Sequence, residues 1–144
     1  MMCLNNKVVI ITGSAQGLGK AFAARLLEDG AKVCISDVNG DKGEAAAAEL
    51  GERFGPGNVV FVECDVTKEA EFRRLFERAE AAFRVECVDI LVNNAGINAS
   101  HGWRRCMEVN ILAVMCGAEI AMERMGRAGK HGQIVNTASL GALL

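Results

Sequence analysis

The sequence predicts an α/β protein built on a doubly wound parallel sheet. Short apolar runs rich in β-branched residues alternate with longer runs in which apolar residues recur at helical spacing. This alternation is typical of parallel strands joined by right-handed helical crossovers, with helices on both faces of the sheet. Glycine or polar clusters follow the expected strands, and such sheets bind ligands beyond the carboxyl ends of their strands. The sequence therefore predicts both a fold and the edge of the sheet that carries a site.

The first expected strand and helix are joined by a glycine-rich turn. Residues 8–11 are apolar at every position, as in a strand buried on both faces. Gly13, Gly17 and Gly19 follow, and the next run has helical spacing until it stops near Gly30. Free backbone amides and the positive end of a helix dipole meet in such a turn. We therefore expect this turn to bind an anion.

The rest of the chain continues the alternation. The other predicted strands are apolar runs bounded by turn residues, at 32–37, 59–62, 88–92 and from 133 onward. The other predicted helices are 41–54, a helix with Thr67 as its N-cap, and 103–125.

Two of these helices indicate which side chains face the core. One is expected to bury an aromatic-rich face, formed by Phe72, Leu75, Phe76, Ala79 and Phe83. The longest is expected to turn one apolar face inward, formed by Ile111, Val114, Met115, Ala118 and Met122. No linker or repeat interrupts the pattern, so residues 1–144 form one predicted domain.

Composition narrows the classes of function. The chain has 144 residues, of which 51% are hydrophobic and 24% charged, with a net charge of −2. These values favour a globular protein and argue against a nucleic-acid surface. The sequence has neither a membrane-length apolar run nor a signal peptide, so a cytoplasmic location without membrane association is expected. The six cysteines form no C-x-x-C pair, which favours inert thiols over a metal site.

Asp37 is the candidate for selecting the cofactor. It ends the second predicted strand, 24 residues after Gly13, close to the spacing expected of an acid that accepts hydrogen bonds from ribose hydroxyls. The alternative is a simple turn residue, because Asp-Val-Asn-Gly is turn-like. A carboxylate there repels a 2′-phosphate, and neither Gln16 nor Val38 supplies a cation for one. NAD is therefore the expected cofactor, in preference to NADP.

Several motifs in order along the chain resemble the short-chain dehydrogenase/reductase family. They are T-G-x-x-x-G-x-G at 12–19, C-D-V at 64–66, N-N-A-G at 93–96, a helix asparagine at Asn110, and the I-V-N-T-A-S segment ending at Ser139. The resemblance implies a Rossmann fold with strand order 3-2-1-4-5 and a hydride transfer between a secondary alcohol and NAD. It also implies a small-molecule alcohol or ketone as substrate, and a homo-oligomer for the full-length enzyme.

The resemblance also implies roles for individual residues. The cofactor would contact Gly13, Ser14, Gln16, Gly17, Leu18, Gly19, Asp37, Val38, Cys64, Asp65, Val66, Asn94, Ala95 and Gly96. Asp65 and Val66 would flank the adenine, and Asn94 would lie against the nicotinamide-side ribose. Ser139 would donate a hydrogen bond to the substrate oxygen, and the backbone carbonyl of Asn110 would hold a water in a proton path. For Asn110 the alternative is a buried structural asparagine, and for Ser139 a loop serine.

The proton-transfer tyrosine of this family, and the lysine four residues after it, are expected beyond Ser139. The sequence contains no tyrosine and ends at Leu144. We therefore expect an N-terminal portion of the family domain, truncated after about the fifth strand and inactive by itself. A fifth strand left as an open edge would also make it poorly soluble. The alternative is a non-catalytic nucleotide-binding or interaction module.

Overall fold

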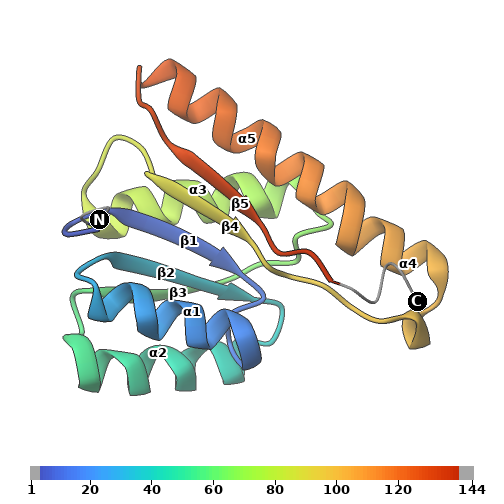
Figure 1. Cartoon of the computed structure of the whole chain (residues 1–144), viewed down its shortest axis with the longest axis horizontal. Coiled ribbons are helices and arrows are strands. Elements are labelled where there is room, and N and C mark those ends of the chain that lie inside the picture. The colour runs from blue at the N-terminus through green and yellow to red at the C-terminus, as the bar shows by residue number, and fades with distance from the viewer. Residues whose placement is uncertain (1–3, 140–144) are drawn as a thin grey trace.

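The computed structural model describes residues 4–139 and contains a five-stranded sheet in the order β3-β2-β1-β4-β5. All the strand pairs are parallel, and their carboxyl ends lie toward α4 in Figure 1. The strands are β1 (Val8–Thr12), β2 (Lys32–Asp37), β3 (Val59–Glu63), β4 (Ile90–Asn93) and β5 (Gln133–Asn136). The predicted doubly wound sheet and its strand order are confirmed.

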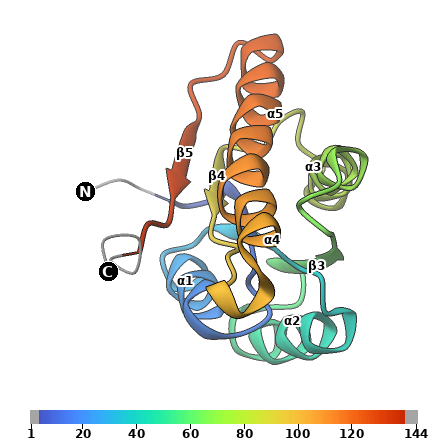
Figure 2. The same ribbon diagram turned by 90° about the vertical axis from the view of Figure 1, so that its right-hand side faces the viewer.

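Helices cover both faces of the sheet. α1 (Gly17–Glu28) and α2 (Gly40–Phe54) lie on one face, and α3 (Glu69–Phe83) and α5 (Ala113–Arg127) lie on the other (Figures 1 and 2). Each pair of consecutive parallel strands is therefore joined by a helix that packs on one face of the sheet, as the alternation of apolar runs predicts. Among residues 4–139, no helix is both long and apolar enough to cross a membrane.

The central strand β1 is buried on both faces because its side chains point alternately to two separate cores. Val8 and Ile10 contact the core beneath α3 and α5. Val9 and Ile11 contact the core beneath α1 and α2. Successive side chains of a strand point to opposite faces, so one continuous apolar run serves both layers. This explains why residues 8–11 carry no polar alternation.

Asp89 fastens the amino-terminal edge of the sheet. Its carboxylate accepts a hydrogen bond from the Val8 N–H at 2.8 Å and pairs with Lys130 at 3.0 Å and Lys7 at 3.3 Å. Its backbone carbonyl accepts the Gln133 N–H that begins β5. Burial opposes ionisation, but these hydrogen bonds and cations outweigh it and hold the pKa of Asp89 below its ordinary value. One residue thus links β1, β4 and β5.

The aromatic face predicted for α3 is confirmed, whereas its predicted cap is wrong. All five predicted side chains are buried against the sheet: Phe72, Leu75, Phe76, Ala79 and Phe83. The N-cap residue is Lys68, and no side chain caps this helix. The Thr67 hydroxyl instead donates to Asp65 Oδ1 at 2.7 Å, because the loop after β3 turns back on itself there.

The long helix predicted at 103–125 is present, but the face predicted to be buried is wrong. Ile111, Met115 and Met122 are 45%, 65% and 61% exposed, and Val114 and Ala118 are half-buried. The buried residues of this helix are Val109, Ala113, Gly117, Ile120, Ala121 and Met125.

Two features of the helix explain this error. α4 (Trp103–Met107) joins α5 through the π-helical turn Glu108–Leu112, which changes the phase of the helical repeat. The inward face of α5 also includes small residues, since a Cβ on Gly117 would lie 2.5 Å from Phe72 Cζ and 2.7 Å from Asn93 Oδ1. Close approach to α3 and β4 therefore selects the small face over the one with large apolar residues.

Gly117→Ala tests this close approach. Overpacking against Phe72 and Asn93 should lower the free energy of unfolding by about 1 to 3 kcal/mol. The control is Gly126→Ala on the same helix, where a Cβ meets nothing within 4 Å. That change should be neutral or stabilise by up to about 1 kcal/mol, because alanine is the better helix former. Urea denaturation followed by circular dichroism measures both, and equal effects would contradict the packing argument.

Candidate functional site

The glycine turn after β1 closes tightly against the loop after β4. Gly13 has a φ of +62°, and a Cβ on it would lie 2.7 Å from Ala95 Cα. A Cβ on Gly19 would lie 2.5 Å from the Gly13 carbonyl oxygen and 2.6 Å from Asn94 Nδ2. Any side chain at either position would separate the two loops. The structure thus brings together the predicted residues of 13–19 with those of 94–96.

Ser14 is a structural member of this turn. It is buried, and its hydroxyl donates to the Ile11 carbonyl at 2.6 Å and accepts the Ser36 N–H at 2.9 Å. Its own N–H donates to the Ser36 carbonyl at 3.0 Å. These bonds fix the turn against the end of β2. Ser14 was predicted to contact the cofactor, but its buried hydroxyl instead stabilises the turn through hydrogen bonds to Ile11 and Ser36.

Thr12 joins the two loops, and the prediction from sequence did not include it among the site residues. Its hydroxyl oxygen accepts the Asn94 and Ala95 N–H groups, each at 3.1 Å, and its side chain is buried. The hydroxyl can also donate to the Val92 carbonyl at 3.5 Å. The sequence did contain a signal for this role, because Thr12 directly follows the apolar run 8–11. A hydroxyl buried at the end of such a strand needs hydrogen-bond partners.

Two successive asparagines tie β4 to its neighbours. Asn94 Nδ2 donates to the carbonyls of Thr12 and Gly13 at 3.2 Å and 3.0 Å. Asn93 Nδ2 donates to the Val114 carbonyl at 3.3 Å and to Asn136 Oδ1 at 3.0 Å. The first therefore faces β1, and the second faces α5 and β5. Asn93 and Asn136 are further residues that order the site and were not predicted.

Asp37 is held in position at the carboxyl end of β2. Its Oδ2 accepts the Ala15 N–H of the glycine turn at 3.1 Å, and its Oδ1 accepts the Asn39 N–H at 3.1 Å. The carboxyl group is only half-buried. Next to it, the Val38 side chain is 65% exposed. This arrangement orients a carboxylate and an apolar side chain at the mouth of the turn.

The segment after β3 divides between core and surface. The Cys64 side chain is buried, and burial together with nearby carboxylates raises its pKa to about 12, so it remains a thiol at neutral pH. Its N–H donates to the Asp37 carbonyl at 3.0 Å. Only the backbone of Cys64 is thus placed to contact a ligand. Asp65 and Val66 are half-buried at the same edge.

Asp65 is held by cations as well as by its own loop. Arg105 Nη2 of α4 lies 3.5 Å from its Oδ2, and Lys68 lies 3.9 Å away. Burial opposes ionisation, but the hydrogen bonds from Thr67 and these cations outweigh it, so the pKa of Asp65 lies below its ordinary value. A carboxylate at this edge is therefore ionised at neutral pH. Arg105 is another contributor that the sequence did not indicate.

The two residues predicted to act on the substrate also lie on the carboxyl side of the sheet. Asn110 sits in the π-helical turn, where its Oδ1 accepts the Ile97 N–H at 2.9 Å and its Nδ2 donates to the Ile97 carbonyl at 2.8 Å. Asn110 thereby fixes the loop that follows Gly96. Ser139 is exposed, three residues beyond β5.

The turn fits a phosphorylated ligand. The N-terminus of α1 has Gln16 as its N-cap with no side-chain hydrogen bond, and its first turn carries no acidic residue. Gly17 has a φ of +58° and nothing within 4 Å of the position a Cβ would take. Uncapped amides beside open space form an anion site at a helix N-terminus. The Leu18 side chain, 55% exposed, borders this space.

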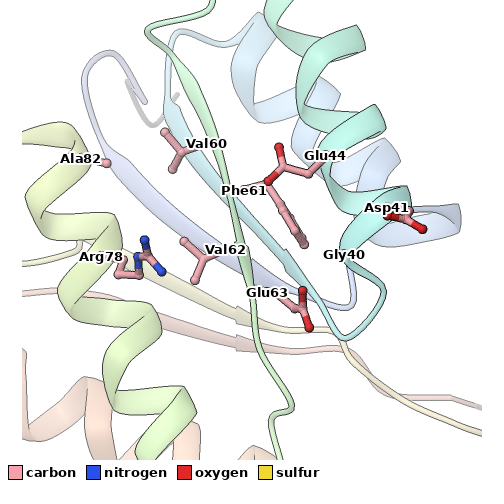
Figure 3. A pocket seen from close by; sticks show the side chains of 9 residues that line it. All are labelled: Gly40, Asp41, Glu44, Val60, Phe61, Val62, Glu63, Arg78 and Ala82. Atoms are coloured by element: carbon pink, nitrogen blue, oxygen red, sulfur yellow. The ribbon is translucent and has the colours of Figure 1, made fainter.

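A separate groove of about 540 Å³ lies along the free edge of β3, between α2 and α3 (Figure 3). Its walls carry Asp41 and Glu44 on α2, Glu63 on β3 and Arg78 on α3. None of the predicted site residues lines it. Within residues 4–139, no cluster of side chains suits a metal ion at this edge or elsewhere. The groove is therefore distinct from the strand-end site.

Residues 7–144 match the family model described as short chain dehydrogenase. The chain belongs to the short chain dehydrogenase family. The members of this family are oxidoreductases, and the glycine turn, the N-N-A-G loop and the strand order found here agree with that assignment.

Named relatives and solved structures agree with this family assignment. The chain is 39% identical to 15-hydroxyprostaglandin dehydrogenase [NAD(+)] of Mus musculus and 38% identical to that of Homo sapiens, covering 99% of this chain and 53% and 54% of those proteins. It is 37% identical to the NADP-dependent (R)-specific alcohol dehydrogenase of Lentilactobacillus kefiri, over 95% of this chain and 56% of that protein. A putative short-chain dehydrogenase structure from Novosphingobium aromaticivorans has a TM-score of 0.88 and 30% identity, covering 100% of this chain and 56% of that one. The chain therefore spans about half the length of these relatives.

Thr12→Val tests the joint between the two loops in this short-chain dehydrogenase. Valine keeps the shape but leaves the Asn94 and Ala95 N–H groups without their acceptor, which should cost about 1 to 3 kcal/mol of unfolding free energy. Thr12→Ser retains the hydroxyl and should lose less. Chemical denaturation measures both variants. A loss in Thr12→Ser as large as the loss in Thr12→Val would contradict the dominant role of the hydroxyl.

Proposed function

We propose that the chain is the cofactor-binding portion of an NAD-dependent oxidoreductase that removes a hydride from a secondary alcohol. The observation that supports this most directly is the Asp37 carboxylate, hydrogen-bonded to the glycine turn beside the uncapped N-terminus of α1. An acid at the end of the second strand suits unphosphorylated ribose hydroxyls, and the helix terminus suits a pyrophosphate. Several relatives whose names specify NAD(+) support the same choice.

The proposed substrate is a 15-hydroxyprostaglandin or a related hydroxy-lipid. The support for it is the name shared by relatives that are 38–39% identical over 99% of this chain. Since the chain spans about half of those proteins, the substrate and the activity belong to the proposal for the whole protein.

The catalytic roles in the proposal are those that the family resemblance implies, and the chemistry of each residue suits its role. Bound NAD supplies the hydride acceptor. Ser139 donates a hydrogen bond to the substrate oxygen as it becomes a carbonyl, which stabilises charge in the transition state. Asn110 contributes its backbone carbonyl to a proton path, and its side chain holds the backbone of Ile97 in the loop after Gly96. Asn94 would lie against the nicotinamide-side ribose of the cofactor, and Ala95 and Gly96 would contact the cofactor from the same loop. Asp65 and Val66 would flank the adenine.

A non-catalytic nucleotide-binding module is the second candidate. One observation favours it: most of the proposed site residues would contact the nucleotide, and only Ser139 and Asn110 are proposed to act on the substrate. Both candidates bind NAD, so turnover by the whole protein distinguishes them.

The proposed cofactor preference is testable on the whole protein by isothermal titration calorimetry. NAD should bind at least about tenfold more tightly than NADP, a difference of about 1.4 kcal/mol. Asp37→Ala should narrow that ratio, because it removes the charge that repels a 2′-phosphate. Equal affinities in the unmutated whole protein would contradict the assignment of Asp37.

Ser139→Ala tests the catalytic role in the whole protein. Turnover with a secondary alcohol should fall about 100-fold or more, since the lost donor acts chiefly on the transition state. The Kd for NAD should stay within a few-fold of the unmutated value. A loss of turnover below fivefold would make Ser139 a structural loop residue.

A further inference from the structure

Lys42 places a positive charge at the mouth of the glycine turn. It lies in the first turn of α2, and its ammonium donates to Gln16 Oε1 at 2.9 Å. Gln16 is the N-cap of α1 and belongs to the glycine turn. Sequence spacing did not indicate this cation, because residues 16 and 42 are 26 positions apart and lie on different elements.

The Lys42 ammonium and the Asp37 carboxylate contact successive residues of the glycine turn. Asp37 Oδ2 accepts the N–H of Ala15, and Lys42 contacts the side chain of the following residue, Gln16. Lys42 and Gln16 are both exposed. Within residues 4–139, Lys42 forms no ion pair with Asp37 or with any other carboxylate. The mouth of the turn therefore carries one fixed negative charge and one uncommitted positive charge.

The two charges act in opposite directions on a phosphorylated ribose. The carboxylate accepts hydrogen bonds from ribose hydroxyls and repels a phosphate, whereas a lysine ammonium attracts one. The N-terminus of α2, which begins two residues before Lys42, adds positive potential in the same place.

We propose that Lys42 is a latent 2′-phosphate-binding residue, so that Asp37 alone prevents this chain from accepting NADP. The inference rests on the proposed binding of a dinucleotide at the glycine turn. It adds that the cation needed for the phosphorylated cofactor is already present, held on Gln16. Removal of one negative charge is then sufficient to change the cofactor preference.

The test is calorimetric titration of NAD and NADP into four forms of the whole protein: unmutated, Asp37→Asn, Asp37→Asn with Lys42→Ala, and Asp37→Asn with Lys20→Ala. Asp37→Asn should bind NADP at least tenfold more tightly than the unmutated chain does. Adding Lys42→Ala should weaken NADP binding about tenfold, and at least fivefold more than it weakens NAD binding. The matched control is Lys20→Ala, which removes an ammonium bound to Glu49 and should leave NADP affinity within twofold.

Two further measurements make the outcomes distinct. Asp37→Asn with Lys42→Arg should retain NADP binding, and raising the salt concentration should weaken NADP binding more than NAD binding. Circular dichroism confirms that each variant is folded. NADP affinity that is unaffected by Lys42→Ala, while NAD still binds the unmutated chain, would overturn this inference and leave the proposed function intact. Failure of the folded, unmutated whole protein to bind either dinucleotide would overturn both.

Discussion

The geometry of the strand-end site depends on the buried Thr12 hydroxyl. It accepts two backbone N–H groups from the loop after β4 at the point where β1 ends. Because β1 is the central strand and is buried on both faces, this point is fixed by both cores of the domain. The glycine turn, the N-N-A-G loop and, through Asn94 and Thr137, the segment after β5 are all positioned relative to it. The loops of this surface-exposed site are thus held in place by buried hydrogen bonds.

Charge at the strand-end site is distributed over three segments. Asp37 is oriented by backbone N–H groups, Asp65 by its own loop and by Arg105, and Lys42 by Gln16. Each group is exposed or half-buried, so solvent and salt moderate the interactions of all three. The preference of such an edge for one charged ligand over another is the difference between attraction by its cations and repulsion by its carboxylates. This preference therefore depends on every charged group that the loops bring together, and not on one acidic residue.

The long helix shows how packing decides between two apolar faces of one sequence. Its large side chains Met115 and Met122 are exposed, while Ala113 and Gly117 lie against the sheet and α3. The small face permits a close approach that lets Asn93 donate to the Val114 carbonyl. The π-helical turn before it places Asn110 against Ile97. Both the packing and the site thus depend on a change of helical phase between residues 107 and 113.

The sequence by itself determined the alternation of strands and helices, the aromatic face of α3 and the edge of the sheet that carries the site. These follow from local periodicity and from glycine positions, which neighbouring residues already specify. Only the tertiary structure decided which face of α5 is buried, which hydroxyl joins the loops after β1 and β4, and where Lys42 and Arg105 lie. Those features join residues far apart in the chain, such as Thr12 and Asn94 or Gln16 and Lys42. Their contacts exist only once parallel strands bring their carboxyl ends to one edge.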